Sequence, residues 1–127
     1  MSKTEIRTDD APKPPANFSQ GVRKGNILQV AGQVAFDAAT GTVVGTTVAE
    51  QTRQTFKNIE TVLKAGGASL DDVVMLRVFL TDVSQFGEMN GVWDEIFTGP
   101  AAPARTTIYV GLPAGLLVEI DALAVLD

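Results

Sequence analysis

The spacing of apolar residues predicts two amphipathic helices set among strands. The first has an apolar stripe that recurs every three or four residues, made of Thr52, Phe56, Ile59 and Leu63. Thr47-Val48-Ala49-Glu50 has the form of a capping box, in which Thr and Glu side chains satisfy backbone amides at a helix start. Gly66 and Gly67 are typical of a helix end. This pattern predicts a helix from about residue 47 to residue 65.

The second predicted helix covers residues 83–97. Asp82 is placed to cap it, because a carboxylate at this position accepts hydrogen bonds from the first free amides. Its stripe at helical spacing consists of Phe86, Asn90, Trp93 and Phe97. Gly87 and Gly91 each lower the stability of a helix by roughly 1 kcal/mol relative to Ala, so they make this prediction weaker than the first.

The remaining regular segments read as strands. Residues 18–23 and 27–34 flank Lys24-Gly25-Asn26, whose Gly and Asn favour a hairpin turn. Further strands are predicted at residues 42–44, 73–80, 106–110 and 116–125, and the apolar, β-branched segment 73–80 is expected at the sheet centre. The order β-β-β-α-β-α-β-β indicates an α+β fold with one sheet and both helices on one face. The apolar content of the strands predicts that another subunit covers the other face.

The N-terminal segment differs in composition from the rest of the chain. Residues 1–16 contain three prolines and five charged side chains besides Lys13, so a flexible leader is expected there, followed by a single domain over residues 17–127. The segment lacks the apolar stretch of a signal peptide, and no apolar run reaches the roughly 18 residues of a membrane span. We therefore expect a cytoplasmic protein without a membrane partner.

Composition removes several kinds of chemistry. Ten Lys and Arg against fifteen Asp and Glu give a net charge of −5, and there is no basic run, so nucleic acid is not expected as a partner. The chain has no His and no Cys, which excludes imidazole bases, thiolate nucleophiles and metal sites built from those ligands. Neither a metal nor another cofactor is predicted. Acid and base work is left to carboxylates, Lys, Tyr, backbone groups or water.

Two polar groups lie on otherwise apolar elements. Asn90 is part of the stripe of the second helix, where its amide is either satisfied structurally or reaches the floor of a pocket. Glu119 and Asp121 are two residues apart on the last strand and so share one face of the sheet. They are either interface or surface carboxylates, or one of them has a raised basicity through partial burial and activates a water molecule.

Arg105 and Gly32 are further candidates. Arg105 follows Pro103-Ala104 at the start of a strand, and its planar guanidinium either forms a structural salt bridge or holds the carboxylate of a ligand. Gly32 lies inside an apolar strand, where the missing side chain permits close approach by another backbone or by a ligand.

From residue 11 onward the chain resembles the Rid family of reactive-intermediate deaminases, which have also been described as L-PSP endoribonucleases and translation inhibitors. The most specific similarity is Pro103-Ala104-Arg105-Thr106 followed by Gly111-Leu112-Pro113. The other matching segments, in chain order, are residues 17–22, 25–26, 30–33, Asn90, Phe97 and residues 118–122. Their order and spacing together carry the resemblance.

The resemblance implies a fold and a site. The fold would be chorismate-mutase-like, assembled as a homotrimer whose sheets face the trimer core and whose clefts lie between subunits. Arg105 would bind the substrate carboxylate, and Glu119 would position or activate the attacking water. The resemblance further implies a substrate-binding set consisting of Phe18, Ala31, Gly32, Asn90, Arg105 and Thr107.

The implied reaction is the hydrolysis of reactive 2-imino or enamine acids, such as 2-iminobutanoate and 2-iminopropanoate, to 2-keto acids and ammonia. It needs a carboxylate anchor and modest proton transfer, but neither a metal nor His. Phe18, Ala31 and Thr107 replace the Tyr, Ser and Cys that are common in the family. These changes leave open a deaminase of another unstable enamine, of the aminomuconate or aminoacrylate type. A non-catalytic regulatory trimer that binds a small ligand is the alternative from another functional class.

Overall fold

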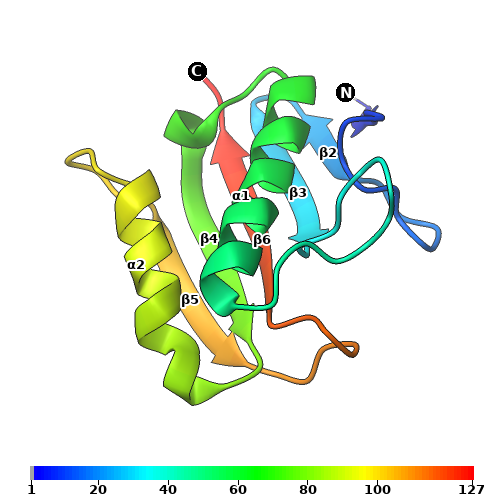
Figure 1. Cartoon of the computed structure of the whole chain (residues 1–127). Helices are drawn as coiled ribbons and strands as arrows, with labels where there is room; N and C mark the ends of the chain where they lie inside the picture. The colour runs from blue at the N-terminus through cyan, green and yellow to red at the C-terminus, as the bar shows by residue number, and fades with distance from the viewer. Residues whose placement is uncertain (1) are drawn as a thin grey trace.

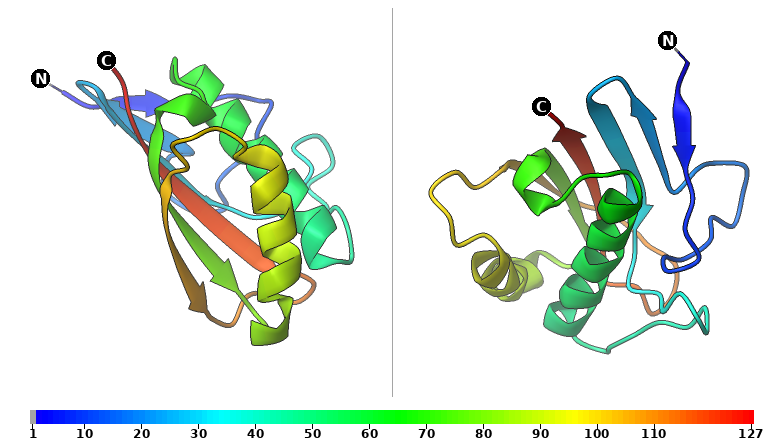
Figure 2. Two further views of the ribbon diagram at one scale, coloured as in Figure 1. Left: turned by 90° about the vertical axis from the view of Figure 1, so that its left-hand side faces the viewer. Right: turned by 90° about the horizontal axis from the view of Figure 1, so that it is seen from above.

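One mixed sheet carries both helices on the same face (Figures 1 and 2). The computed structural model describes residues 2–127. The strands are β1 (Thr4–Ile6), β2 (Gly21–Lys24), β3 (Ile27–Gln33), β4 (Val73–Leu80), β5 (Ala104–Tyr109) and β6 (Val118–Val125). They lie in the order β1-β2-β3-β6-β4-β5; β4 and β5 pair in parallel and the other neighbours are antiparallel. The predicted α+β class is confirmed.

Helix α1 (Val48–Ala65) begins with the predicted capping box. The Thr47 hydroxyl accepts a hydrogen bond from the Glu50 amide at 3.2 Å, and the Glu50 carboxylate accepts one from the Thr47 amide at 3.1 Å. Gly66 caps the other end. The whole predicted stripe of this helix is at most 2% exposed, so the sequence pattern identified its inner face.

Helix α2 (Phe86–Ile96) is shorter than predicted. One 3₁₀ turn, η2 (Val83–Gln85), precedes it, and Asp82 accepts a hydrogen bond from the Ser84 amide at 2.8 Å as a cap. The buried residues of α2 are Met89, Val92 and Trp93. Phe86, which the stripe had placed inward, is 37% exposed. The helix therefore presents the Phe86 end of its stripe to the edge of the sheet and not to the core.

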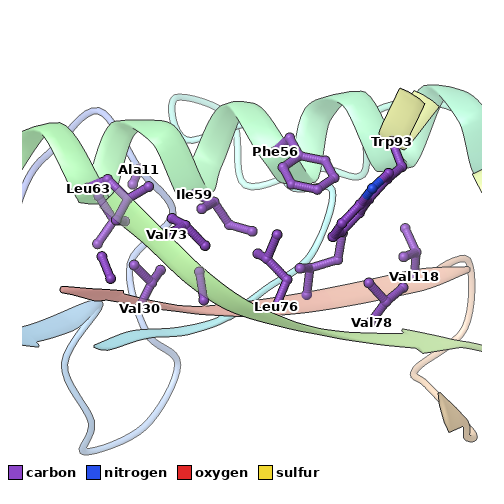
Figure 3. Packing of buried hydrophobic residues seen from close by; sticks show 14 of the residues in the cluster. Ala11, Val30, Phe56, Ile59, Leu63, Val73, Leu76, Val78, Trp93 and Val118 are labelled. Atoms are coloured by element: carbon purple, nitrogen blue, oxygen red, sulfur yellow. The ribbon is translucent and has the colours of Figure 1, made fainter. Parts of the chain in front are cut away.

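The core fills the layer between the helices and the sheet (Figure 3). Phe56, Ile59 and Leu63 of α1 point toward the sheet, where Val30, Leu76, Val78 and Val118 rise from β3, β4 and β6. A second 3₁₀ turn, η1 (Leu70–Asp72), leads into β4. Strand β4 has the predicted bounds, but its predicted place at the sheet centre was wrong: β3 and β6 are the central strands, and β4 lies between β6 and the edge strand β5.

Two predictions about the N-terminal part were wrong. Within the segment predicted to be a flexible leader, Thr4–Ile6 forms β1 against β2, and Ile6 and Ala11 are almost fully buried; Met1 lies outside the described residues. The Gln20 side chain fixes this segment against the domain, because its amide bonds to backbone groups of Thr8, Ala11 and Pro12.

Residues 42–44 form no strand, only an isolated bridge from Val43 to Phe36.

The second face of the sheet carries no helix in residues 2–127 (Figure 2). Apolar side chains on it are exposed, among them Ile27 at 52%, Ile108 at 40% and Val125 at 39%. This is the face that the sequence predicted to meet another subunit. Among the described residues, no helix is both long and apolar enough to cross a membrane.

Candidate functional site

Arg105 lies on the helix-covered face of the sheet, at the edge strand β5. Its register partner on β4 is Leu76, which is fully buried beneath the helices, and strand alternation places the two side chains on one face. The guanidinium carbon of Arg105 lies 4.7 Å from the ring centroid of Trp93 and 5.4 Å from that of Phe86, both on α2. A guanidinium at such distances makes cation–π contacts with both rings.

The hydrogen-bond donors of this guanidinium are free. In residues 2–127, Arg7, Arg53 and Arg77 form ion pairs, and Arg23 donates to backbone carbonyls. Arg105 makes neither an ion pair nor a side-chain hydrogen bond within that part of the chain. The structural salt bridge considered from the sequence is therefore absent within the described chain, and a planar set of donors remains available to a carboxylate.

An open hollow of about 420 Å³ lies beside Arg105, lined also by Asn90, Trp93, Asp94 and Pro103. The side-chain oxygen of Asn90 is buried and has no hydrogen-bond partner among the described residues. Within the described part of one chain the Asn90 oxygen therefore lacks the partner that a structural amide would have, and its position agrees with the pocket-floor interpretation. Thr107 is next on the same face of β5, opposite the buried Val78.

Glu119 lies on the opposite face. It pairs in register with Phe79 of β4, and its neighbours Val118 and Ile120 point into the core. Partial burial, and to a lesser extent the charge of Asp121, raises the pKa of Glu119 above the usual range of a glutamate. Asp121 itself is bound by Arg77 at 2.9 Å. Of the two carboxylates that share this face, Asp121 is structural, while Glu119 has no hydrogen-bond partner in residues 2–127.

Gly32 leaves the space that the Glu119 side chain occupies. A Cβ atom at Gly32 would lie 2.5 Å from a carboxylate oxygen of Glu119 and 3.0 Å from the carboxylate carbon. The space at Gly32, which was predicted to admit another backbone or a ligand, is therefore occupied by a side chain of the neighbouring strand. Ala31 precedes this point, and its amide donates to the Gln20 carbonyl at 2.9 Å.

Phe18 lies apart from both groups. It is 51% exposed and lines a hollow of about 680 Å³ formed by β1, β2 and the segment between them. This hollow is larger than the one beside Arg105, yet neither Arg105 nor Glu119 lines it. The volume of a hollow therefore does not identify the site. Polar side chains without hydrogen-bond partners in the described part of the chain, such as Arg105 and Asn90, identify it better.

The predicted residues thus form two groups that a single chain keeps apart. Arg105, Asn90 and Thr107 belong to the helix-covered side, whereas Glu119 lies against Gly32 on the open face, and β4 separates β5 from β6. Sequence reasoning missed Trp93 and Phe86 as walls around Arg105. The sequence did indicate that these two rings lie together, because their seven-residue spacing places both on one face of α2 with Asn90 between them.

Chemically, the arrangement offers an anion receptor and a proton acceptor. A half-buried guanidinium with free donors binds small carboxylates, and a carboxyl group with a raised pKa is a stronger base. Within the described residues, no group of three or more potential His, Cys, Asp or Glu ligands could hold a metal ion.

Known proteins resemble the chain over nearly its full length. A family model described as endoribonuclease L-PSP matches residues 8–126. A RutC family protein of Pyrococcus horikoshii is 43% identical over 123 residues, which cover 96% of this chain and 97% of the relative. A 2-iminobutanoate/2-iminopropanoate deaminase of Dermatophagoides farinae is 34% identical over 126 residues, 98% of either chain. The solved structure of a Yersinia pestis protein of the conserved Rid family, of unknown function, matches with a TM-score of 0.93 at 35% identity, covering 98% of this chain and 100% of that one.

Proposed function

The chain belongs to the endoribonuclease L-PSP family, which includes the Rid proteins, and from this premise we propose that it hydrolyses reactive 2-imino acids to 2-keto acids and ammonia. The observation that carries the proposal is the Arg105 guanidinium, which is half-buried between two aromatic rings and makes no hydrogen bond within residues 2–127. Its N–H donors are accessible from the open hollow and are not used by the described part of the chain, so a ligand carboxylate can bind them in place of water.

The active unit would be an assembly of copies, and we propose a homotrimer. Arg105 and Glu119 lie on opposite faces of one sheet, so one chain cannot place both against the same small molecule. A second copy seated on the open apolar face brings its own Arg105 edge within reach of the first copy's Glu119. Exposed apolar residues on that face supply the reason for association.

In the proposed reaction, Arg105 holds the substrate carboxylate by paired hydrogen bonds. Glu119 of the neighbouring copy accepts a proton from a water molecule as the water oxygen bonds to the imine carbon. Glu119 passes this proton to the imine nitrogen, which gives a carbinolamine. The hydroxyl proton of the carbinolamine then moves to the nitrogen, the carbon–nitrogen bond breaks, ammonia leaves and the carbonyl of the keto acid forms, with Glu119 again a carboxylate. The raised pKa of Glu119 favours this proton transfer.

The substrate class follows from the size and polarity of the surroundings. Trp93 and Pro103 offer apolar surface in the hollow beside Arg105, which fits a short aliphatic side chain. 2-Iminobutanoate and 2-iminopropanoate, the compounds in the printed name of the Dermatophagoides farinae relative, have this form. An aminoacrylate-type enamine shares the same carboxylate and belongs in the same substrate panel.

Ribonuclease activity, which the family description carries, has little support in this chain. The net charge is −5, there is no His, and a single free guanidinium is not the basic groove that RNA requires. A regulatory trimer without activity would use the same hollow and differ only in lacking turnover.

The test is ammonia release from imines formed in situ by an amino-acid oxidase. The purified protein is expected to accelerate release from the imines of alanine and 2-aminobutanoate, and Arg105→Ala to lose most of that acceleration. Equal rates for the wild type and Arg105→Ala would refute the catalytic assignment. Tight binding of 2-keto acids without turnover on any imine of the panel would instead identify a regulatory protein.

A further inference from the structure

The Arg105 guanidinium lies between two aromatic rings of α2. Phe86 and Trp93 are seven residues apart, which corresponds to about 10.5 Å of rise along a helix. The guanidinium carbon lies 5.4 Å from the first ring centroid and 4.7 Å from the second. Both distances lie within the roughly 6 Å range of a cation–π contact, so the guanidinium contacts both rings at once.

One of these rings is anchored and the other is not. Trp93 is 8% exposed and packs against Phe97 at 4.6 Å and Phe56 at 6.2 Å between ring centroids, which ties it to α1 and the core. Phe86 is 37% exposed and forms the outer wall. The position of the guanidinium is therefore set mainly from the Trp93 side.

Stacking and hydrogen bonding use different parts of a guanidinium. Aromatic rings contact its faces, whereas its N–H donors point outward in its plane. A stacked Arg therefore keeps its donors free while losing the freedom to swing its long side chain away. A carboxylate then meets donors that are already oriented.

We propose that Trp93, assisted by Phe86, is a positioning residue that holds the Arg105 guanidinium in the orientation for carboxylate binding. This inference rests on the proposed role of Arg105 as the carboxylate receptor. It adds that the affinity for the anion depends on an aromatic residue that does not bond to the ligand. It also makes Trp93 an optical reporter of occupancy, because it is the single Trp of the chain.

The experiment uses the full-length protein in its native assembly and butanoate as the probe. Butanoate titration is expected to give a saturable change in Trp93 fluorescence that is absent in Arg105→Ala. Butanamide, which has the same shape without the charge, is the matched ligand control and should give no saturable change. A Trp93 signal that responds equally to both compounds would contradict stacking on a carboxylate-binding guanidinium.

Calorimetry on variants then tests positioning directly. Trp93→Leu should weaken butanoate binding roughly 3- to 30-fold, as expected from the strength of cation–π contacts, and raise KM for the imine with little change in kcat. Trp93→Phe should recover most of the affinity, because it keeps a ring. Phe86→Leu, at an exposed position where folding is not at risk, should show a smaller loss of the same kind.

Unchanged butanoate affinity in both Trp93→Leu and Phe86→Leu would overturn the positioning role while leaving the deaminase proposal intact. The deaminase proposal can also fail while the positioning role stands. A wild type that binds butanoate in a Trp93-dependent way but turns over no imine would overturn the proposed reaction and support the positioning role.

Discussion

At the scale of single residues, the raised pKa of Glu119 predicts the pH dependence of the reaction. A water-activating carboxylate must be ionised, so activity should rise with pH through a midpoint above the ordinary value of about 4.5. Asp121→Asn removes the second cause of the shift and frees the cation of Arg77, and both effects lower the pKa of Glu119. The acid limb of kcat should therefore move to lower pH in Asp121→Asn, as measured by pH–rate profiles. An unmoved limb would mean that another group titrates.

The same shift sets the sign of a stability effect. Between about pH 4.5 and the folded pKa, the unfolded chain loses the Glu119 proton while the folded chain keeps it. Stability therefore falls as pH rises across this window, and above it Glu119 causes no further change with pH. Glu119→Gln should flatten that fall in urea titrations carried out from pH 4.5 upward.

We predict that Asn90 lowers the free energy of unfolding of the protein and that its role is to bind the ligand. Because its buried oxygen has no partner in residues 2–127, Asn90→Leu should raise the free energy of unfolding by about 1 kcal/mol and reduce imine turnover. Asn58 is the matched control: its amide bonds to the carbonyls of Val34 and Phe36 at 2.9 Å each. Asn58→Leu should destabilise the fold. A loss of stability in both variants would show that Asn90 is satisfied in the assembled protein.

Gly32→Ala is predicted to act on Glu119. The added methyl would lie 2.5 Å from a carboxylate oxygen, so the flexible Glu119 side chain must turn away while the backbone remains as it is. We expect a roughly 10- to 100-fold lower kcat with little change in the unfolding midpoint. Gly99→Ala, where a Cβ would meet nothing within 4 Å, is the control and should leave kcat unchanged. Equal activity of the two variants would remove Glu119 from the reaction.

For single residues, the sequence could predict which side chains share one face of a strand or helix, but not which contacts they make. Alternation placed Glu119 and Asp121 together, but only the structure shows that Arg77 takes Asp121 and leaves Glu119 without a partner. Helical spacing likewise put Asn90 and Trp93 on one stripe. That Arg105 fills the space between the rings depends on how α2 lies across β5, which no local pattern contains.

At the scale of elements, the capping box of α1 gives a measurable prediction. Thr47→Ala removes the hydroxyl that accepts from the Glu50 amide and should cost about 1 kcal/mol in the free energy of unfolding. Thr46→Ala is the matched control, because the Thr46 side chain makes no hydrogen bond within residues 2–127 while its amide, which bonds to Glu50, is retained. Equal urea midpoints for the two variants would contradict the capping role.

Elements with strong local signals were predicted well, and those held by distant contacts were not. Helix α1 has a cap, a stripe and a terminating Gly, and β4 is a long apolar run. Strand β1 is three residues long and exists because β2 offers it an edge and Gln20 fixes the segment that follows. Residues 42–44 are all β-branched and so favour a strand, but they form only the single bridge from Val43 to Phe36. Three strands still precede α1, as predicted, because β1 takes the place in the order of the strand predicted at residues 42–44.

For the whole molecule, the division of the site between the two faces of the sheet predicts complementation between inactive variants. If each cleft takes Arg105 from one copy and Glu119 from its neighbour, Arg105→Ala and Glu119→Gln chains can form intact clefts together. After denaturation and joint refolding at equal amounts, about a quarter of the clefts in any closed ring should combine an intact Arg105 with an intact Glu119. The mixture should therefore recover about a quarter of the wild-type ammonia release, whereas either variant refolded alone should recover none. Mixed assemblies that form, as verified by native mass spectrometry, but stay inactive would mean that both groups must come from one chain. Activity of either variant refolded alone would mean that the group it lacks takes no part.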